Sequence, residues 1–465
     1  MASFRRPWWR HVCPCSWLRG GRSLCGGQGS AAATLLGRGR WPAEGKLAAE
    51  HALLQATIAR QRGDKEATLA LTQQALALAP PEAEALQADI WRNLGQVWLM
   101  RGDWLRAAHA LGEAIERAED DDQRGHGLVG LGILHQSQGE LREAAVIFRQ
   151  ILALPAPNPA TGMAALGLGM VLAEWNELTE AAHWLVAGIG QVKPSLEQYM
   201  LARGYVALAQ VQQAQGLPTA ALATLTEAED WFGQVQILGP GPALWLAPHR
   251  ARLWLQQGQV GTAVRWAETH TFHSKGELAV VEQLTMVRLR LAQNQPRLAS
   301  DHLTATRAIR TAEEHLSYKV EVALLEALCQ QKVGNTAAVG FALGRALEWA
   351  EPAGYVRLFL NEGAVMADLL RHALAQGMAP VYVGRLLAGW GAAVPTPHSP
   401  LPNPPTAREL EILRLLNSGA TNQEIADALV VAVSTVKKHI SNLLTKLDAT
   451  NRVEALARAR DAGLL

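Results

Sequence analysis

Residues 91–114 read WRNLGQVWLMRGDWLRAAHALGEA and contain two helix-length stretches on either side of Gly102. Large apolar residues of the first stretch recur at intervals of three and four, which places them on one face of a helix: Trp91, Leu94 and Trp98. The second stretch repeats the helical spacing with Ala107, Leu111 and Ala114. Because glycine commonly ends helices, the pattern predicts two helices joined by a tight turn.

The same arrangement recurs along the chain at a nearly fixed period. The residues that interrupt helical patterns are Gly63, Gly102, Gly139, Asn176, Gly216, Gly258, Asn294 and Gly334, at intervals of 36 to 42 residues. Six of these turns are followed five residues later by an alanine, namely Ala107, Ala144, Ala181, Ala221, Ala263 and Ala299. A small residue there lets the two helices of a hairpin approach closely. The period predicts an all-α solenoid of helical hairpins.

The unit that begins at Trp91 resembles the tetratricopeptide repeat, whose pattern is W-x2-L-G-x2-Y followed by an alanine and a large apolar residue. Trp98 stands where tyrosine is usual, and the Leu-Gly pair recurs at Leu131-Gly132 and Leu168-Gly169. The period exceeds the 34 residues of the plain repeat, so longer helices or connections are expected. The resemblance implies a curved superhelix with a concave surface.

Several tryptophans lie within these helices: Trp98, Trp104, Trp175, Trp184, Trp231, Trp245, Trp254 and Trp266. Packing between repeats is the preferred interpretation, and the alternative is that one or two of them line a groove for a ligand or peptide. The histidines at positions 109, 135, 183 and 249 are interpreted as surface or core residues, since no HExxH or comparable pair was recognised.

Composition excludes several classes of protein. The chain has 43 Lys and Arg against 42 Asp and Glu, so any contact with nucleic acid must be local. No apolar run approaches the roughly 18 residues of a membrane-spanning helix, which predicts a cytoplasmic protein without a membrane partner. Cys13, Cys15 and Cys25 with His11 lack the paired spacing of structural zinc, so no metal site is predicted.

Residues 1–45 carry seven arginines before the first acidic residue and show no periodicity. They are predicted to be disordered or to precede the true domain. The repeat domain is then expected over residues 46–391, a Pro-rich linker over 392–405 and a further domain over 406–465. The chain contains no GK[ST] tripeptide, so no phosphate-binding loop, cofactor or enzymatic activity is predicted, and no catalytic residue is named.

The last domain has four helix-length patterns in about 60 residues. The third, over residues 433–447, has an apolar stripe formed by Val436, Ile440, Leu443, Leu444 and Leu447. Its opposite face carries Lys437, Lys438, Ser441, Asn442 and Thr445, and we expect Lys446 to add to its positive field. Asn422 is a possible N-cap of the preceding short helix. A helix with cations and short polar side chains fits the major groove of DNA.

Residues 406–465 resemble the LuxR-type helix-turn-helix domain along their full length, with RE near the start, G-x-[TS]-N-x-E-I-A, T-V-K-x-H, L-x-K-L and R-x-E-A. The resemblance implies base contacts by Lys437, Lys438 and Ser441, with Asn442 and Thr445 also facing the groove. It implies phosphate contacts by Asn422 and Thr435, and dimerisation through Val453, Leu456 and Ala457. The serine or threonine that usually caps the recognition helix is Ala432 here.

The whole arrangement resembles the C-terminal half of the large ATP-binding LuxR regulators related to the maltose-regulon activator. The resemblance implies a regulator that binds double-stranded DNA as a homodimer, works with RNA polymerase, and is controlled by a small-molecule inducer or a protein at the superhelix. The ATPase module of those regulators is expected to be absent. Either it was lost, or the gene start lies in a frame-disrupted region. A protein-interaction scaffold with a weak or vestigial DNA-binding domain is the alternative.

Overall fold

A computed structural model of the chain describes residues 42–154, 160–193, 197–234, 241–390, 407–417, 420–429, 431–446, 449, 452 and 455. These residues form helices and no strand, so the predicted all-α class is confirmed. Contacts divide the chain into two units, residues 1–382 and 383–465. The predicted linker lies outside the described residues. No helix among those described is long and apolar enough to cross a membrane.

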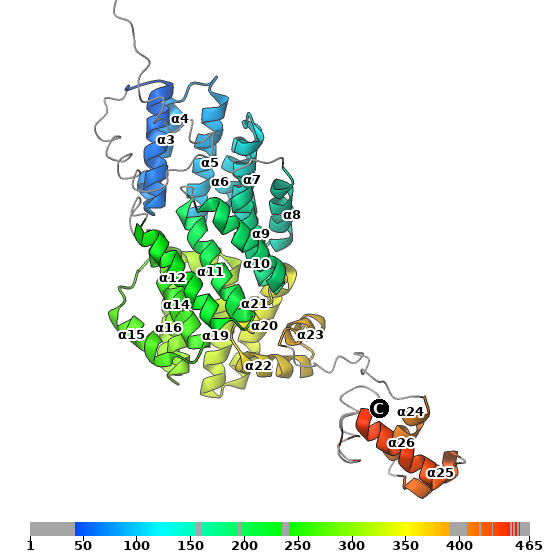
Figure 1. Cartoon of the computed structure of the whole chain (residues 1–465). Helices are drawn as coiled ribbons and strands as arrows, with labels where there is room; N and C mark the ends of the chain where they lie inside the picture. The colour runs from blue at the N-terminus through cyan, green and yellow to red at the C-terminus, as the bar shows by residue number, and fades with distance from the viewer. Residues whose placement is uncertain are drawn as a thin grey trace, which may run out of the picture. The chain divides into compact units, whose positions relative to one another are not determined.

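Eight antiparallel helical hairpins build most of the first unit within the described residues (Figure 1). In chain order they are α3 (Lys46–Gln61) with α4 (Lys65–Leu78), α5 (Glu84–Arg101) with α6 (Trp104–Glu116), α7 (Asp121–Gln138) with α8 (Leu141–Leu152), α9 (Ala160–Glu174) with α10 (Leu178–Val192), α11 (Gln198–Ala214) with α12 (Pro218–Gln234), α14 (Leu246–Gln256) with α15 (Val260–Thr269), α16 (Gly276–Ala292) with α17 (Pro296–Arg307), and α19 (Leu316–Val333) with α20 (Thr336–Ala353).

All eight predicted turn residues lie between the two helices of a hairpin and have positive φ, from 58° at Asn294 to 83° at Gly139. At Gly102 the chain reverses in a Schellman motif, in which the N–H of Asp103 donates to the carbonyl of Trp98 at 3.0 Å. The carboxylate of Asp103 then accepts from the N–H of Arg106 at 3.1 Å and caps α6. The same short segment therefore ends one helix and begins the next.

The Leu-Gly pairs bring the two helices of a hairpin together. A Cβ atom on Gly95 would lie 2.6 Å from Cγ of Leu111, and one on Gly169 would lie 2.7 Å from Cγ of Leu185. Gly132 meets the ring of Phe148 in the same way. Each large side chain comes 16 residues after its glycine and is fully buried. The glycine thus provides the space that the partner helix fills.

The six alanines predicted at the hairpin contacts have no exposed surface. At the same place after the first and last turns stand Thr68 and Val339, which are also buried. All eight positions are therefore buried, as a point of close helix approach requires. Of the eight tryptophans named from the sequence, Trp245 is buried and the others are half-buried.

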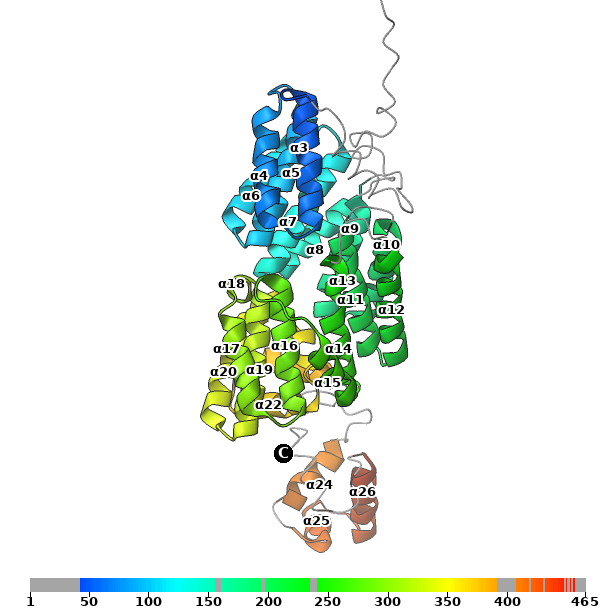
Figure 2. The same cartoon turned by 90° about the vertical axis from the view of Figure 1, so that its left-hand side faces the viewer.

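Late segments of the repeat array contact the turns of earlier hairpins (Figure 2). The shorter helices α18 (Arg310–Glu314) and α21 (Arg357–Leu360) meet turns of the second to fourth hairpins: Arg310 binds the carbonyl of Arg101, and the N–H of Val356 donates to the carbonyl of Glu174 at 2.8 Å. The indole N–H of Trp175 donates to the carbonyl of Ala353 at 3.1 Å. The remaining helices of the repeat region are α13 (Gly241–Leu244), α22 (Ala364–Ala375) and α23 (Pro380–Ala388).

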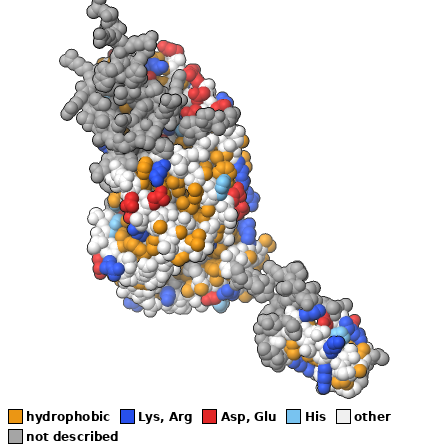
Figure 3. Space-filling view, in the orientation of Figure 1, with side chains coloured by type: hydrophobic (Ala, Val, Ile, Leu, Met, Phe, Trp, Pro, Cys, Tyr) orange, Lys and Arg blue, Asp and Glu red, His pale blue; other side chains and the backbone are white. Residues whose placement is uncertain are grey.

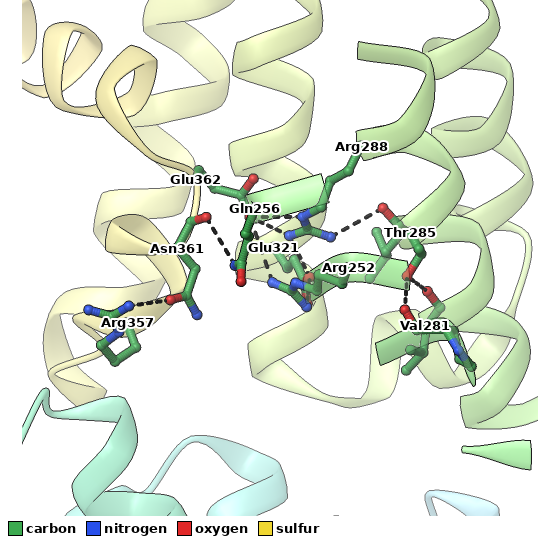
Figure 4. Close-up of polar contacts among 11 residues, drawn as sticks. Arg252, Gln256, Val281, Thr285, Arg288, Glu321, Arg357, Asn361 and Glu362 are labelled. Atoms are coloured by element: carbon green, nitrogen blue, oxygen red, sulfur yellow. Dashed lines mark hydrogen bonds and ion pairs between the residues drawn. The ribbon is translucent and has the colours of Figure 1, made fainter. Parts of the chain in front are cut away.

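A buried ion network joins three hairpins to the segment after α21 (Figure 4). Arg252 and Arg288 bind the same carboxylate oxygen of Glu321, at 2.8 and 2.6 Å. Arg288 also binds Glu362, with its Nε atom at 3.1 Å from Oε1. All four side chains are 5–10% exposed. Burial alone raises the pKa of Glu321, but the two guanidinium groups outweigh it and hold that pKa below its ordinary value.

Glu174, at the end of α9, interacts with Glu321 and Arg252 of this network but has weaker compensation for its charge. Its Oε2 atom is enclosed and has no hydrogen-bond partner among the described residues. Burial, with the nearby negative charge of Glu321, raises the pKa of Glu174 to about 7, although Arg252 and Arg357 act in the opposite direction. The native array therefore favours the protonated form of this carboxyl group.

Replacement of Gly132 by alanine should destabilise the array. The added Cβ would lie 2.7 Å from Cζ of Phe148 and closer still to Cε1, and overpacking of this kind costs about 1–3 kcal/mol. Thermal unfolding followed by circular dichroism measures the loss. Gly112→Ala is the matched control, because a Cβ at Gly112 on α6 meets no atom within 4 Å and alanine favours the helix. Equal midpoints for the two variants would contradict the close packing at Gly132.

Replacement of Glu174 by glutamine should change how stability depends on pH. A native pKa of about 7, against 4.5 for the unfolded chain, means that the native state binds more protons between these values. The wild-type stability should then fall by roughly 2–3 kcal/mol between pH 5 and pH 8 relative to the variant. Unfolding midpoints at both pH values test this, with the exposed neighbour Glu177→Gln as control. Identical pH dependence of Glu174→Gln and wild type would refute the assignment.

Candidate nucleic-acid interface

The described helices after α23, all in the second unit, are α24 (Ala407–Asn417), α25 (Asn422–Leu429) and α26 (Val433–Lys446). A single apolar core holds them together, made of Ile412, Leu413, Leu416, Ile425, Ala426, Val436, Leu443 and Ala455. The last of these residues comes from the fourth helix pattern of the sequence. Ile440 and Leu444 pack against this core as predicted, while Leu447 lies outside the described residues. The core fixes which face of α26 remains outside.

The N-terminus of α25 is capped by Thr421 rather than by Asn422, so the expected N-cap was wrong. The N–H of Thr421 donates to Oε2 of Glu424 at 2.6 Å, and the N–H of Glu424 donates back to the threonine hydroxyl at 3.3 Å. This is the reciprocal capping box of the pattern T-x-x-E. The hydrogen bonds from Thr421 lower the pKa of Glu424. Asn422 is instead the first residue of the helix.

A tight connection leads from α25 to α26. The N–H of Val431 donates to the carbonyl of Ala426 at 3.0 Å, and the carbonyl of Ala432 accepts from the N–H groups of Thr435 and Val436 at 2.9 and 3.2 Å. Ala432 is thus the N-cap residue of α26, and its methyl side chain cannot accept a hydrogen bond from the first N–H groups of the helix. The geometry is that of two short helices joined by a turn, the second being the longer.

The predicted base-contacting residues share the outer face of α26. Lys437, Lys438, Ser441 and Asn442 are exposed, as is Thr435 at the helix start, and Asn422 is half-buried. Thr445 is on the same helix, but its side chain lies outside the described residues, as do Val453, Leu456 and Ala457. Figure 3 shows Lys and Arg side chains on the visible face of this unit. No acidic residue occurs between positions 433 and 446, so the field on this face is positive.

Lys446 does not belong to that face, contrary to the expectation from its sequence position. Its ammonium group lies 2.8 Å from Oε2 of Glu409, and the two side chains are 15% and 4% exposed. The pair joins the last turn of α26 to the first turn of α24. Its charge is compensated inside the domain, and the outward positive charge of α26 comes from Lys437 and Lys438.

Two further arginines of the sequence motifs act as internal connections that sequence reasoning did not identify. Arg408 donates to the carbonyl of Leu429 at 2.7 Å, which ties the start of α24 to the end of α25. Arg452 donates to the carbonyls of Leu416 and Ala420 at 3.0 and 3.1 Å. These carbonyls follow or end α24 and would otherwise lack helical partners. The motif positions RE and R-x-E-A thus maintain the packing that presents α26.

One group of side chains in the described part of the chain is arranged as metal ligands are, and it lies in the repeat region: His270, His273 and Glu282. The sequence prediction named no metal ligand, and the HxxH spacing of the two histidines was the signal that it overlooked. The cysteines and histidine near the N-terminus, His11, Cys13, Cys15 and Cys25, lie outside the described residues.

Curated proteins similar to the chain include a transcriptional regulatory protein and a response regulator protein. The transcriptional regulatory protein LiaR of Bacillus subtilis is 48% identical over 105 residues, which are 21% of this chain and 47% of LiaR. The response regulator protein VraR of Staphylococcus aureus is 45% identical over 60 residues, which are 13% of this chain and 29% of VraR. The chain therefore spans less than half the length of either relative.

A solved structure shares the repeat architecture. The Rap protein complexed with competence and sporulation factor superposes with a TM-score of 0.52 at 11% identity, over 74% of this chain and 98% of that chain. At this identity the likeness concerns the fold alone. It agrees with the helical-hairpin solenoid described above.

Family models match both units. Residues 404–459 match the luxR family of bacterial regulatory proteins, which covers α24 to α26. Residues 49–376, well over half of the chain, match the MalT-like TPR region. The chain therefore belongs to the family with a MalT-like TPR region, and it carries a C-terminal domain of the luxR family.

Proposed function

We propose that the chain is a sequence-specific transcriptional regulator that places α26 in the major groove of double-stranded DNA. The observation that carries this proposal is the outer face of α26, which has two exposed lysines and short polar side chains and no acidic residue. A helix fits the width of the major groove, and lysine can donate to O6 and N7 of guanine. In this role Lys437, Lys438 and Ser441 reach bases, and Asn442 and Thr445 face the groove beside them.

The start of each of the two helices supports the docking. Asn422 and Thr435 stand in the first turns of α25 and α26, where side chains and backbone N–H groups can contact phosphate. The proposed dimer, formed through Val453, Leu456 and Ala457, would bind two half-sites roughly one helical turn apart. RNA polymerase is then the partner through which DNA binding affects transcription, in the cytoplasm.

The repeat array is proposed to control this activity by binding a small-molecule inducer or a protein. Its interior contains polar groups that a ligand can engage: Glu174 has an enclosed, unpartnered oxygen, and both ring nitrogens of His249 lack hydrogen-bond partners within the described structure. Burial lowers the pKa of His249 to about 3, so its ring is neutral. A ligand that rearranges these hairpins would also move the segment around α21, to which Arg288 and Glu174 are bound.

The alternative function is a protein-interaction scaffold with a weak or vestigial DNA-binding domain. Its lysines would then give salt-sensitive binding without sequence preference. Genome-wide selection of DNA fragments with the purified full chain separates the two functions. A shared palindromic motif supports the regulator, and binding without a motif supports the scaffold.

Replacement of both Lys437 and Lys438 by alanine should weaken binding to the selected site at least tenfold at about 150 mM salt, because a good base contact is worth about 1–3 kcal/mol. Fluorescence anisotropy with the selected duplex measures the affinity. The double variant Lys275→Ala and Lys332→Ala removes the same charge from exposed positions of the repeat array. Equal losses in the two double variants would reject the assignment of α26 to the groove.

Replacement of Leu456 by aspartate should reduce dimerisation on DNA, since a carboxylate in an apolar dimer contact is costly to desolvate. We expect protection of a single half-site in footprinting, at protein concentrations where the wild type protects two. Circular dichroism of the variant checks that the domain remains folded. An intact dimeric footprint would show that residues around 456 have another role.

A further inference from the structure

We propose that His270, His273 and Glu282 form a binding site for a divalent transition-metal ion, with Zn²⁺ as the best-fitting member of the class. The site lies in the sixth and seventh hairpins, in the connection from α15 to α16. His270 directly follows α15, His273 is in the loop, and Glu282 is in the second turn of α16. This assignment is independent of the proposed DNA binding.

The ligand atoms already converge. Nε2 of His270 and Nδ1 of His273 lie 2.8 and 2.9 Å from the same atom, Oε1 of Glu282, and the ligand atoms of the group all lie within 4.8 Å of one another. Around a tetrahedral zinc ion with bonds of about 2.0–2.1 Å, ligand atoms are roughly 3.3 Å apart. The Nε2 atom of His270 and the Nδ1 atom of His273 would each have to move about half an ångström away from Oε1 to admit the ion.

The charge of Glu282 supports the same conclusion. Its side chain is fully buried, and its ion-pair partners in the described structure are the two histidines, with no lysine or arginine. A buried carboxylate requires a compensating charge or a metal ion. Neutral histidines give no positive charge, whereas a divalent cation bound by both rings and the carboxylate does. The N–H of His273 also donates to Oε2 of Glu282 at 2.8 Å, which orients the carboxylate toward the loop.

The surroundings fit a site with one open position. The His270 ring is 10% exposed and lies against Trp266 and Phe272, with ring centroids at 4.8 and 4.9 Å. His273 is 38% exposed, which gives the ion access from solvent. Two imidazole nitrogens and one carboxylate oxygen are ligands that Zn²⁺ accepts, with water as the fourth ligand. Mg²⁺ and Ca²⁺ prefer oxygen ligands and fit this set poorly.

Zinc titration of the full chain in competition with a chromogenic chelator tests the site. The protein is used without a polyhistidine tag and after removal of metal. A chain with Cys13→Ser, Cys15→Ser and Cys25→Ser serves as the background, so that thiols near the N-terminus cannot supply the signal. We expect one equivalent of Zn²⁺ to bind, and the same ion to raise the thermal unfolding midpoint.

His270→Ala and His273→Ala should each weaken zinc binding at least tenfold and remove the thermal shift. His273 is the safer position because its side chain is partly exposed and its loss should leave the fold intact. His135→Ala is the matched control, since His135 faces Glu140 as an isolated histidine-carboxylate pair, and it should bind zinc as the background does. Absence of a saturable equivalent in the background, or equal affinity in His273→Ala, would overturn the site and leave a histidine-carboxylate hydrogen-bond network.

Discussion

The close approach of two helices within each hairpin is the constraint on which the rest of the repeat array depends. Gly95, Gly132 and Gly169 leave space for large side chains of the partner helix. Leu111, Phe148 and Leu185 fill this space and are fully buried between the two helices. A single hairpin still exposes one apolar face, which only the next hairpin covers. Local packing therefore sets the stacking, and the stacking brings the turns of early hairpins against α18 and α21.

The repeat architecture was predictable because its determinants are local. A residue with positive φ ends a helix whatever surrounds it, and all eight predicted turns have that conformation. The buried alanines follow from the same period, since they stand five residues after six of the eight turns. The contacts between late segments and earlier turns were not predictable. They rest on pairs such as Trp175 with Ala353 and Arg310 with Arg101, far apart in the sequence, for which no local spacing gives a signal.

On the candidate DNA-binding face, too, local features were predictable from the sequence and contacts between distant residues were not. The exposure of Lys437 and Lys438 follows from the apolar stripe on the other side of α26, which sequence periodicity identifies. Lys446 lies on the same helix and has the same charge, yet it pairs with Glu409, 37 residues earlier. Helical periodicity could not reveal this partner because it belongs to another element. The capping box of Thr421 and Glu424 follows the sequence pattern T-x-x-E, so it was predictable, although Asn422 was expected to be the N-cap.

Three buried or enclosed carboxylates in the repeat array illustrate how one problem of desolvation has different solutions. Glu321 keeps its charge because two guanidinium groups bind it. Glu174 has weaker compensation, and burial raises its pKa to about 7, so that it binds a proton more readily than an exposed glutamate does. Glu282 has neither a guanidinium nor an ammonium partner in the described structure. Two imidazole rings share its Oε1 atom, and the N–H of His273 donates to its Oε2 atom. Since an isolated buried charge is unfavourable, this third arrangement is the one that a bound cation would complete.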